Sequence, residues 1–224
     1  MKIGAVTIGQ SPRDDIIPEI REILGPGVEI IEAGALDGLS LVEVKDFYPE
    51  STDHTLVTRM KDGTEVKVAE KHIVPRLNNC ILELEHQGAD ILMLLCTGEF
   101  PFIESGGILL RPDRIVGNVV KGILDKGRLG VIVPSPGQIS AMKKKWGRAN
   151  LYVVSEAVSP YRGTEKEIFE TANKVKNFNV DLIVLDCMGF NKKAKAIFRE
   201  VTQKPVLLPR TILGRIAREI VEVK

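Results

Sequence analysis

Hydrophobic residues fall into short runs that alternate with helical patterns along almost the whole chain. Apolar runs rich in Val, Ile and Leu predict strands at 2–8, 28–33, 90–96, 107–110, 128–134, 151–154, 181–187 and 205–208. Helical spacing of apolar residues predicts helices near 14–24, 70–87, 112–126, 136–147, 163–177, 190–202 and 209–222. Continuous apolar strands separated by helices are typical of a parallel sheet that is covered on both faces. The pattern therefore predicts an α/β protein of flavodoxin-like character.

Two stretches repeat each other, and each sets a cysteine at the end of a predicted strand. Residues 89–98 read ADILMLLCTG and residues 180–189 read VDLIVLDCMG, so an aspartate precedes each cysteine by six positions. The similarity continues in 108–117 and 206–214, where each strand breaks at a proline before an amphipathic helix. We therefore expect two similar lobes with mainly parallel sheets, related by pseudo-twofold symmetry, and an active-site cleft between them.

Residues 37–69 interrupt this alternation in the first half only. Asp62-Gly63 lies between two runs of alternating polarity, which is the strongest short signal of a β-hairpin. The segment is interpreted as an insertion with a short helix and a hairpin, and it could be a lid, a dimer arm or decoration. With this insertion, lobe 1 is expected to comprise 1–112 plus 209–224, and lobe 2 to comprise 113–208.

Composition and charge exclude several kinds of partner. Lysine plus arginine total 31 against 30 acidic residues, and the basic residues do not gather with aromatic ones as in nucleic-acid-binding proteins. We expect no signal peptide, because the opening strand lacks the apolar stretch and small-residue cleavage site, and no membrane span, because no run of roughly 18 apolar residues occurs. Three cysteines, an odd number, favour a reducing compartment. A cytoplasmic protein whose partners are small neutral or anionic molecules is therefore expected.

The motifs of common cofactors are missing from the sequence. No Gly-x-Gly-x-x-Gly follows the first predicted strand, and no Gly-x-x-x-x-Gly-Lys-Ser/Thr occurs, which disfavours nicotinamide and triphosphate chemistry. The histidines, His54, His72 and His86, lack the spacing of metal ligands. We therefore expect neither a cofactor nor a metal.

The loops that follow the strands hold the candidate binding residues, because ligands of open α/β sheets bind beyond the carboxyl ends of the strands. Gln10, Ser11 and Arg13 follow the first strand, and Ser135 lies in the counterpart loop of the second half. Hydroxyl and amide groups near a helix start favour an anion, and an arginine can hold a carboxylate. The alternative is that both serines are helix N-caps and that Arg13 is solvated.

The two cysteine loops read Cys96-Thr97-Gly98 and Asp186-Cys187-Met188-Gly189. A helix N-terminus after a strand can lower the pKa of such a thiol and make it useful as a base, and the glycine allows a ligand to approach the backbone. The alternative is that the cysteines simply pack in the core, as we expect for Cys80. Strand alternation predicts that Asp186 points away from Cys187, where it could anchor a loop. If the strand has already ended before Asp186, the side chain would lie in the cleft instead.

The paired half-domains with one cysteine each resemble the aspartate/glutamate racemase superfamily. Thr7-Ile8-Gly9 and the block Val184–Phe190, with the insertion between them, resemble the AroM family more closely. The resemblance implies cofactor-free chemistry in which one cysteine removes the α-proton and the other returns a proton to the opposite face. It also implies that Thr97 helps to hold a carboxylate and that Ser11 supplies a hydroxyl.

This chain departs from the racemase pattern at both cysteines. The racemases usually show Cys-Asn-Thr at the first site and Gly-Cys-Thr with a following histidine at the second, where this chain has Cys96-Thr97-Gly98 and Asp186-Cys187-Met188. A carboxylate donor and a thiol-activating partner are therefore missing. Dimers are common among similar proteins, so a homodimer is included among the expectations.

The sequence thus predicts a cofactor-independent racemase or isomerase-type enzyme that acts on a small carboxylate through cysteine acid/base chemistry, with a decarboxylase as a variant. Cys187 is the principal catalytic residue and Cys96 its partner. The alternative is a non-catalytic small-anion-binding or regulatory protein with the same fold. The expected substrate-binding residues are Gln10, Ser11, Arg13, Thr97, Gly98, Ser135, Met188 and Gly189.

Overall fold

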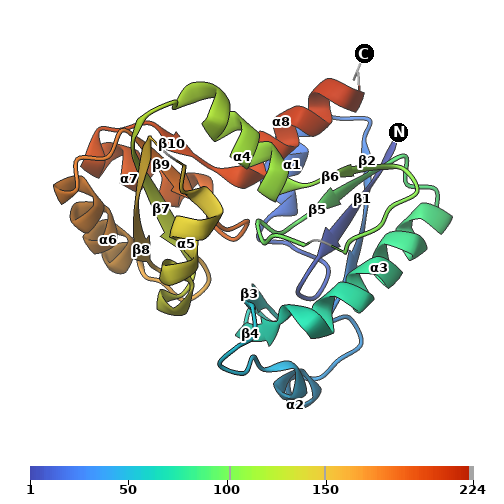
Figure 1. The fold of residues 1–224 in the computed structure, drawn as a ribbon. Helices are drawn as coiled ribbons and strands as arrows, with labels where there is room; N and C mark the ends of the chain where they lie inside the picture. The colour runs from blue at the N-terminus through green and yellow to red at the C-terminus, as the bar shows by residue number, and fades with distance from the viewer. Residues whose placement is uncertain (101, 149, 222–224) are drawn as a thin grey trace. The chain divides into compact units, whose positions relative to one another are not determined.

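The chain forms two compact units in a computed structural model that describes residues 1–100, 102–148 and 150–221 (Figure 1). The first unit comprises Met1–Asp113 and the segment from Leu213 onward, and the second comprises Arg114–Ile212. The chain passes between the units within two helices, α4 (Pro112–Ile123) and α8 (Pro209–Val221). The predicted α/β class is confirmed, because each unit contains a parallel four-stranded sheet.

The sheet of the first unit has the order β2-β1-β5-β6. Its strands are β1 (Lys2–Thr7), β2 (Glu29–Gly34), β5 (Ile91–Leu94) and β6 (Ile108–Leu110). Its main helices are α1 (Ile17–Leu24) and α3 (Glu70–His86). The buried face of α3 presents Ile73, Leu77, Ile81 and Leu84 to strand residues such as Val6 and Leu94. This apolar packing fixes the carboxyl edge of the sheet, where the predicted loops lie.

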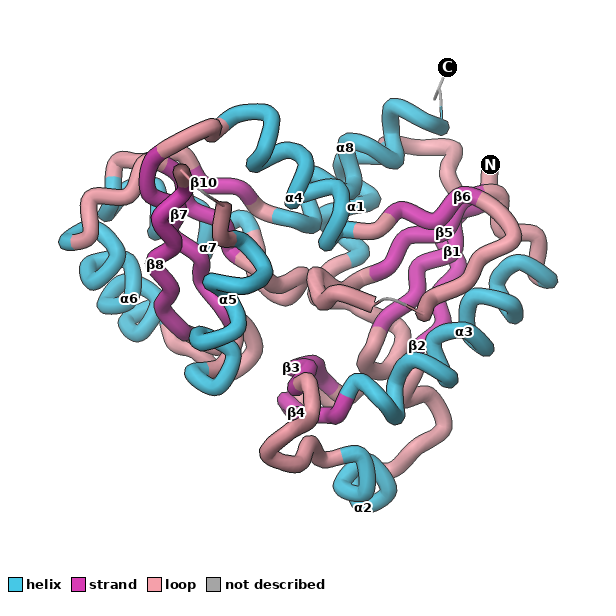
Figure 2. Tube along the Cα trace, in the orientation of Figure 1, coloured by secondary structure: helices cyan, strands magenta, loops and turns pink. Residues whose placement is uncertain are grey.

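The sheet of the second unit has the order β10-β9-β7-β8. Its strands are β7 (Gly127–Val133), β8 (Leu151–Ala157), β9 (Leu182–Leu185) and β10 (Val206–Leu207). Helices α5 (Ile139–Trp146), α6 (Glu165–Asn177) and α7 (Lys192–Thr202) cover it. Figure 2 shows α5 and α6 on opposite sides of these strands. Successive residues of β9 enter opposite cores: Leu182 and Val184 pack with α5, whereas Ile183 and Leu185 pack with α6 and α7.

The predicted insertion forms the expected short helix and hairpin. Helix α2 (Leu41–Val44) is capped by Ser40 and runs into a single tight turn, η1 (Lys45–Phe47). Strands β3 (Thr55–Arg59) and β4 (Glu65–Ala69) pair in antiparallel fashion. The turn between them uses Gly63 at φ +95°, a conformation that favours glycine. Apolar side chains of the hairpin join the core of the first unit.

Several predicted boundaries differ from the observed ones. The first helix begins at Ile17 and not near 14, because the amides of Ile16 and Ile17 bond to the carbonyl of Arg13 in a preceding turn. The predicted helix 136–147 opens with a tight turn, η2 (Pro136–Gln138), before α5. Strands β5 and β9 end two residues before Cys96 and Cys187. Both cysteines therefore belong to loops. Across the described residues, none of the helices has the length and apolar content that crossing a membrane requires.

Candidate functional site

The turn after β9 presents Cys187 to the carboxyl edge of its sheet. The Cys187 amide bonds back to the Leu185 carbonyl at 2.8 Å, which turns the chain sharply where the strand ends. The amide of Gly189 lies 3.4 Å from the Cys187 sulfur and donates to it. The sulfur is thus nine-tenths buried yet in contact with a polar N–H group. A donor aimed at sulfur favours the thiolate over the thiol.

Asp186 points away from the cysteine, as strand alternation predicts, and anchors α5. Its carboxylate accepts from Lys145 Nζ at 2.7 Å and from Trp146 Nε1 at 2.9 Å. Trp146 is buried, and the Lys145 ammonium is held in this ion pair. Of the two roles considered for Asp186, the loop-anchoring one is therefore observed.

Arg210 donates hydrogen bonds to the backbone of the Cys187 turn. The sequence analysis did not identify this residue. Its guanidinium donates to the Met188 carbonyl at 2.7 and 2.9 Å and to the Gly189 carbonyl at 2.9 Å. The side chain is only 1% exposed. The available signal was an arginine directly after a buried strand, in the part of the repeat that reads Leu-Leu-Pro-Arg. A buried cation beside the turn fixes its carbonyls and adds positive charge near the sulfur.

Tyr161 is a second residue that the sequence reasoning missed. Its hydroxyl lies 3.8 Å from the Cys187 sulfur. The ring lies against Gly189, because a Cβ built there would come within 2.6 Å of the ring carbon that carries the hydroxyl. Glycine is therefore required at 189 for the close approach of the tyrosine ring, whereas the predicted approach of a ligand to this glycine stays a prediction. No sequence signal marks a tyrosine in the loop after β8.

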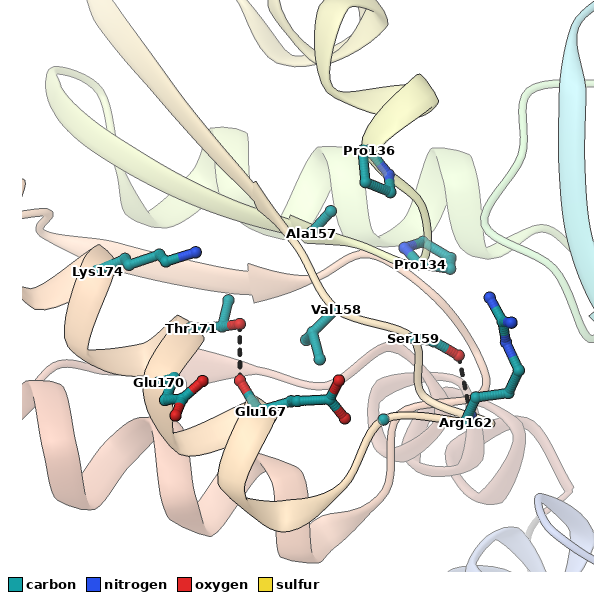
Figure 3. Close-up of a pocket in the computed structure, with 11 residues that line it drawn as sticks. Pro134, Pro136, Ala157, Val158, Ser159, Arg162, Glu167, Glu170, Thr171 and Lys174 are labelled. Carbon is teal, nitrogen blue, oxygen red and sulfur yellow. Dashed lines mark hydrogen bonds between the residues drawn. The ribbon is translucent and has the colours of Figure 1, made fainter.

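Ser135 follows β7, the neighbour of β9, so that its loop and the Cys187 turn lie at one sheet edge. The side chain is buried, but its hydroxyl makes no capping bond to η2. The flanking Pro134 and Pro136 line a pocket of about 550 Å³ (Figure 3). Its remaining lining residues are Ala157, Val158, Ser159, Arg162, Gly163, Glu167, Glu170, Thr171 and Lys174. The loop after β8 thus borders both the pocket and the Cys187 turn.

The first unit repeats the cysteine turn. Cys96 follows β5, is nine-tenths buried, and its sulfur accepts the Gly98 amide at 3.3 Å. Thr97 is also buried. The surroundings differ, because Gly98 packs against Leu56 of the hairpin and against Phe100. The Cys-x-Gly turn with its N–H directed at sulfur is therefore common to both units.

The loop after β1 joins the first sheet to the insertion. Gln10 donates to the carbonyls of Leu36 and Leu39 at 3.1 and 2.8 Å and accepts from the Lys61 amide at 2.8 Å. Ser11 is not the N-cap of α1, since that position is Ile16. Its amide and hydroxyl both donate to Asp37, at 2.7 and 2.6 Å.

Arg13 is buried at 2% exposure, in contrast to the solvated alternative. Its guanidinium makes a two-pronged contact with Asp15 at 2.8 Å and donates to the Thr7 hydroxyl at 2.8 Å. β1 pairs with β5, so this loop and the Cys96 turn lie at one sheet edge. The substrate-binding roles of Gln10, Ser11 and Arg13 stay predictions, because each side chain already has protein partners.

Burial raises the pKa of two side chains in the first unit, Glu32 and Cys80. Burial raises the pKa of Glu32, which accepts the Arg13 amide at 2.6 Å. Burial also raises the pKa of the Cys80 thiol to about 11, so that this cysteine is protonated at neutral pH, in keeping with a packing role. Within residues 1–100, 102–148 and 150–221, no cluster of three or more His, Cys, Asp or Glu could hold a metal ion.

Comparisons with known proteins identify the family of this chain and solved structures with a similar fold. A family model described as AroM protein matches residues 3–221. No curated protein sequence matches the chain. Allantoin racemase from Klebsiella pneumoniae aligns with a TM-score of 0.64 at 14% identity, over 99% of this chain and 87% of the racemase.

Two other solved structures extend the likeness. Glutamate racemase from Francisella tularensis, in complex with D-glutamate, aligns with a TM-score of 0.62 at 14% identity, over 98% of this chain and 80% of that one. Arylmalonate decarboxylase aligns with a TM-score of 0.62 at 12% identity, over 98% of this chain and 91% of the decarboxylase. At these identities the likeness shows the fold alone.

Proposed function

The chain belongs to the AroM family and has the fold of racemases and a decarboxylase, and from that premise we propose a cofactor-independent enzyme that acts on a small carboxylate through cysteine acid/base chemistry. The observation that carries the proposal is the Cys-x-Gly turn of each unit, in which the glycine amide points at the sulfur from 3.3 and 3.4 Å. Cys187 is the principal acid/base group, and Cys96 is its partner.

The proposed chemistry needs a thiolate and a stabilised anion. Removal of an α-proton leaves charge on the substrate carboxylate, and buried N–H and hydroxyl donors stabilise such charge. Thr97 would supply them beside Cys96, and Ser135 and Met188 beside Cys187, while the Gly98 and Gly189 amides already donate to the two sulfurs. A proton returned to the opposite face gives racemisation or isomerisation. A decarboxylase would need only one cysteine, to protonate the enediolate that remains after loss of CO₂.

Deuterium wash-in tests the proposal. Pooled hydroxy, amino and malonate-type acids are incubated with the protein in D₂O, and α-deuterium and CO₂ loss are followed by NMR and mass spectrometry. Wild type should exchange or decarboxylate at least one acid, and Cys187→Ser should lower that rate by at least about 100-fold. Cys80→Ser is the matched control and should leave the rate unchanged. The proposal fails if no acid reacts, or if Cys187→Ser retains the wild-type rate.

The pocket of the second unit favours the alternative, a small-anion-binding or regulatory protein. Figure 3 shows Arg162 and Lys174 at opposite ends of a floor that includes Ala157 and Val158. Among the described residues Lys174 makes no ion pair, whereas the Glu167 carboxylate already accepts from the Thr164 amide and hydroxyl at 2.7 and 2.9 Å. The cation therefore remains available to an anionic ligand.

Calorimetric titration with malonate distinguishes the two functions. A binding protein should bind malonate with the same affinity in wild type and in Cys96→Ser/Cys187→Ser, and Lys174→Ala should weaken binding about tenfold. Lys166→Ala, which removes an exposed lysine of the same helix outside the pocket, is the control. Unchanged affinity in Lys174→Ala would exclude this pocket as the anion site.

A further inference from the structure

We propose that Tyr161 is a positioning residue that donates its phenolic hydrogen bond to the sulfur of Cys187 and keeps that sulfur in the reactive thiolate form. The catalytic meaning of this role rests on the proposed function. The hydrogen bond itself can be tested without any substrate.

The geometry places a phenolic hydroxyl and a backbone amide within hydrogen-bond distance of one sulfur. The Tyr161 hydroxyl lies 3.8 Å from the Cys187 sulfur, and the Gly189 amide lies 3.4 Å from it. Hydrogen bonds of catalytic groups are often long in the absence of substrate and shorten when it binds. A sulfur between a phenol and an amide is better stabilised as an anion than as a thiol, because the thiolate accepts both bonds more strongly.

The backbone around Tyr161 is fixed, so the hydroxyl is held in place. The Ser159 hydroxyl accepts from the amides of Tyr161 and Arg162 at 3.1 and 3.0 Å. The Gly163 amide bonds to the Ser159 carbonyl, and the Val158 amide bonds to the end of β7, both at 3.0 Å. These bonds close the loop 158–163 into a compact turn whose tyrosine ring lies on Gly189. Rigid support of this kind preorganises a polar contact.

Packing alone does not account for a tyrosine at this position. The contacts with Gly189 are made by ring carbons that phenylalanine also has, whereas the hydroxyl lies 3.8 Å from the sulfur. The Cys96 turn of the first unit serves as a comparison, because its glycine, Gly98, packs on Leu56 and Phe100 and not on a tyrosine. The effect of the hydroxyl should therefore be confined to Cys187 and leave Cys96 unchanged.

Alkylation with iodoacetamide, resolved by peptide mass spectrometry from pH 5 to 10, tests the proposal on the full chain. Tyr161→Phe should move the pH midpoint of Cys187 alkylation upward by about one pH unit, which is a tenfold loss of thiolate below the midpoint. The midpoint of Cys96 should not move. Cys80, whose thiol pKa burial raises to about 11, is an internal reference that should react only at the alkaline end.

A second variant tests whether the position of the hydroxyl matters. Gly189→Ala displaces the ring by steric clash and should shift the Cys187 midpoint in the same direction as Tyr161→Phe. If burial prevents alkylation of Cys187, the absorbance of its thiolate near 240 nm gives the pH midpoint of Cys187 below pH 9. This is measured in Cys80→Ser/Cys96→Ser with and without Tyr161→Phe, so that Cys187 is the one remaining thiol. An unchanged Cys187 midpoint in Tyr161→Phe, or an equal shift at Cys96, overturns the proposal.

The outcome is independent of the deuterium experiment. If no acid exchanges deuterium but Tyr161→Phe shifts the Cys187 midpoint, the proposed function fails and the hydrogen bond stands. If exchange occurs and the midpoint does not move, the proposed function stands and Tyr161 has no role in activation. If both hold, the pH profile of exchange should shift with the alkylation midpoint in Tyr161→Phe.

Discussion

The two cysteine turns share a backbone geometry but rest on different supports. In the second unit, buried Arg210 donates to the carbonyls of Met188 and Gly189, and the Tyr161 hydroxyl lies near the sulfur. In the first unit, the glycine of the turn packs on an aliphatic and an aromatic side chain, one of them from the inserted hairpin. The two turns therefore differ in the side chains that contact them, with an arginine and a tyrosine hydroxyl at Cys187 and the side chains of Leu56 and Phe100 at Gly98.

The order of two residues in the repeat explains part of this difference. The first unit reads Leu-Leu-Arg-Pro, and Arg111 pairs with Asp113 of the following helix at 2.9 Å. The second unit reads Leu-Leu-Pro-Arg, and Arg210 reaches the cysteine turn instead. A shift of one position along the chain redirects the side chain. Related segments of one sequence can therefore hold a helix start in one unit and a cysteine turn in the other.

Removal of Arg210 should have the largest effect on stability. Arg210→Met leaves two buried carbonyls without their charged donor and should lower the free energy of unfolding by about 2–4 kcal/mol, measured by urea unfolding. Arg111→Met should cost about 1 kcal/mol, because its partner Asp113 also faces the N-terminus of α4. Arg210→Lys should recover part of the loss. Equal costs at both positions would mean that the two arginines play equivalent roles.

Replacing the glycine of each cysteine turn with alanine tests whether the two glycines differ in how closely their neighbours pack against them. Gly189→Ala places a Cβ 2.6 Å from the ring of Tyr161 and 2.8 Å from Pro160, and the resulting strain should cost about 1–3 kcal/mol. Gly98→Ala meets a leucine methyl and a phenylalanine ring at 3.1 Å, which can shift slightly, so the cost should stay below about 1 kcal/mol. Thermal and urea unfolding of both variants measure the difference. A larger cost at Gly98 would contradict it.

The hairpin connection exists only in the first unit and should have an intermediate effect. Gln10→Ala removes two partly buried hydrogen bonds and one exposed hydrogen bond between the loop after β1 and residues 36–61, and should cost about 1–2 kcal/mol. Amide hydrogen exchange at Lys61 should become faster by about tenfold or more. Gln87→Ala removes an exposed contact with Glu83 and should change neither quantity by much. Unchanged protection at Lys61 would show that the hairpin is held by its apolar core alone.

Much of the fold could be predicted because it follows from local patterns. The apolar runs and the Asp62-Gly63 turn predicted the parallel strands and the hairpin, and strand alternation predicted that Asp186 points away from Cys187. Those features depend on periodicity within a few residues. The same reasoning located the cysteines at the ends of strands, while their catalytic roles stay predictions.

The supports of the turns could not be predicted because they join segments distant in sequence. Arg210 and Met188 are 22 positions apart, and Tyr161 and Cys187 are 26 apart, so only the folded sheet brings them together. Arg13 was considered either a carboxylate clamp or a solvated residue, but the turn before α1 buries it against Asp15. The chemistry of a loop residue depends on the partners that the fold supplies.

The smallest predicted effect contrasts two glutamates in their response to pH. Burial raises the pKa of Glu32 in the first unit, whereas hydrogen bonds from Thr164 lower the pKa of Glu167 in the second. A raised carboxyl pKa means that folding disfavours the charged form. The stability that Glu32 contributes is thus present below its unfolded pKa, near 4.3, and is lost as the pH rises through its folded value.

Glu32→Gln keeps an oxygen for the Arg13 amide and removes the penalty on the charge, so it should raise the melting temperature at pH 7 by about 1–3 °C and leave it unchanged near pH 4. Glu167→Gln should have the opposite sign, with a lower melting temperature at pH 7 and no difference once the pH falls below the lowered pKa of Glu167. Thermal unfolding from pH 3 to 8 measures both differences. A lower melting temperature at pH 7 in Glu32→Gln as well would contradict this contrast. It would mean that the hydrogen bond from the Arg13 amide, which lowers the pKa of Glu32, stabilises the charged form more than burial destabilises it.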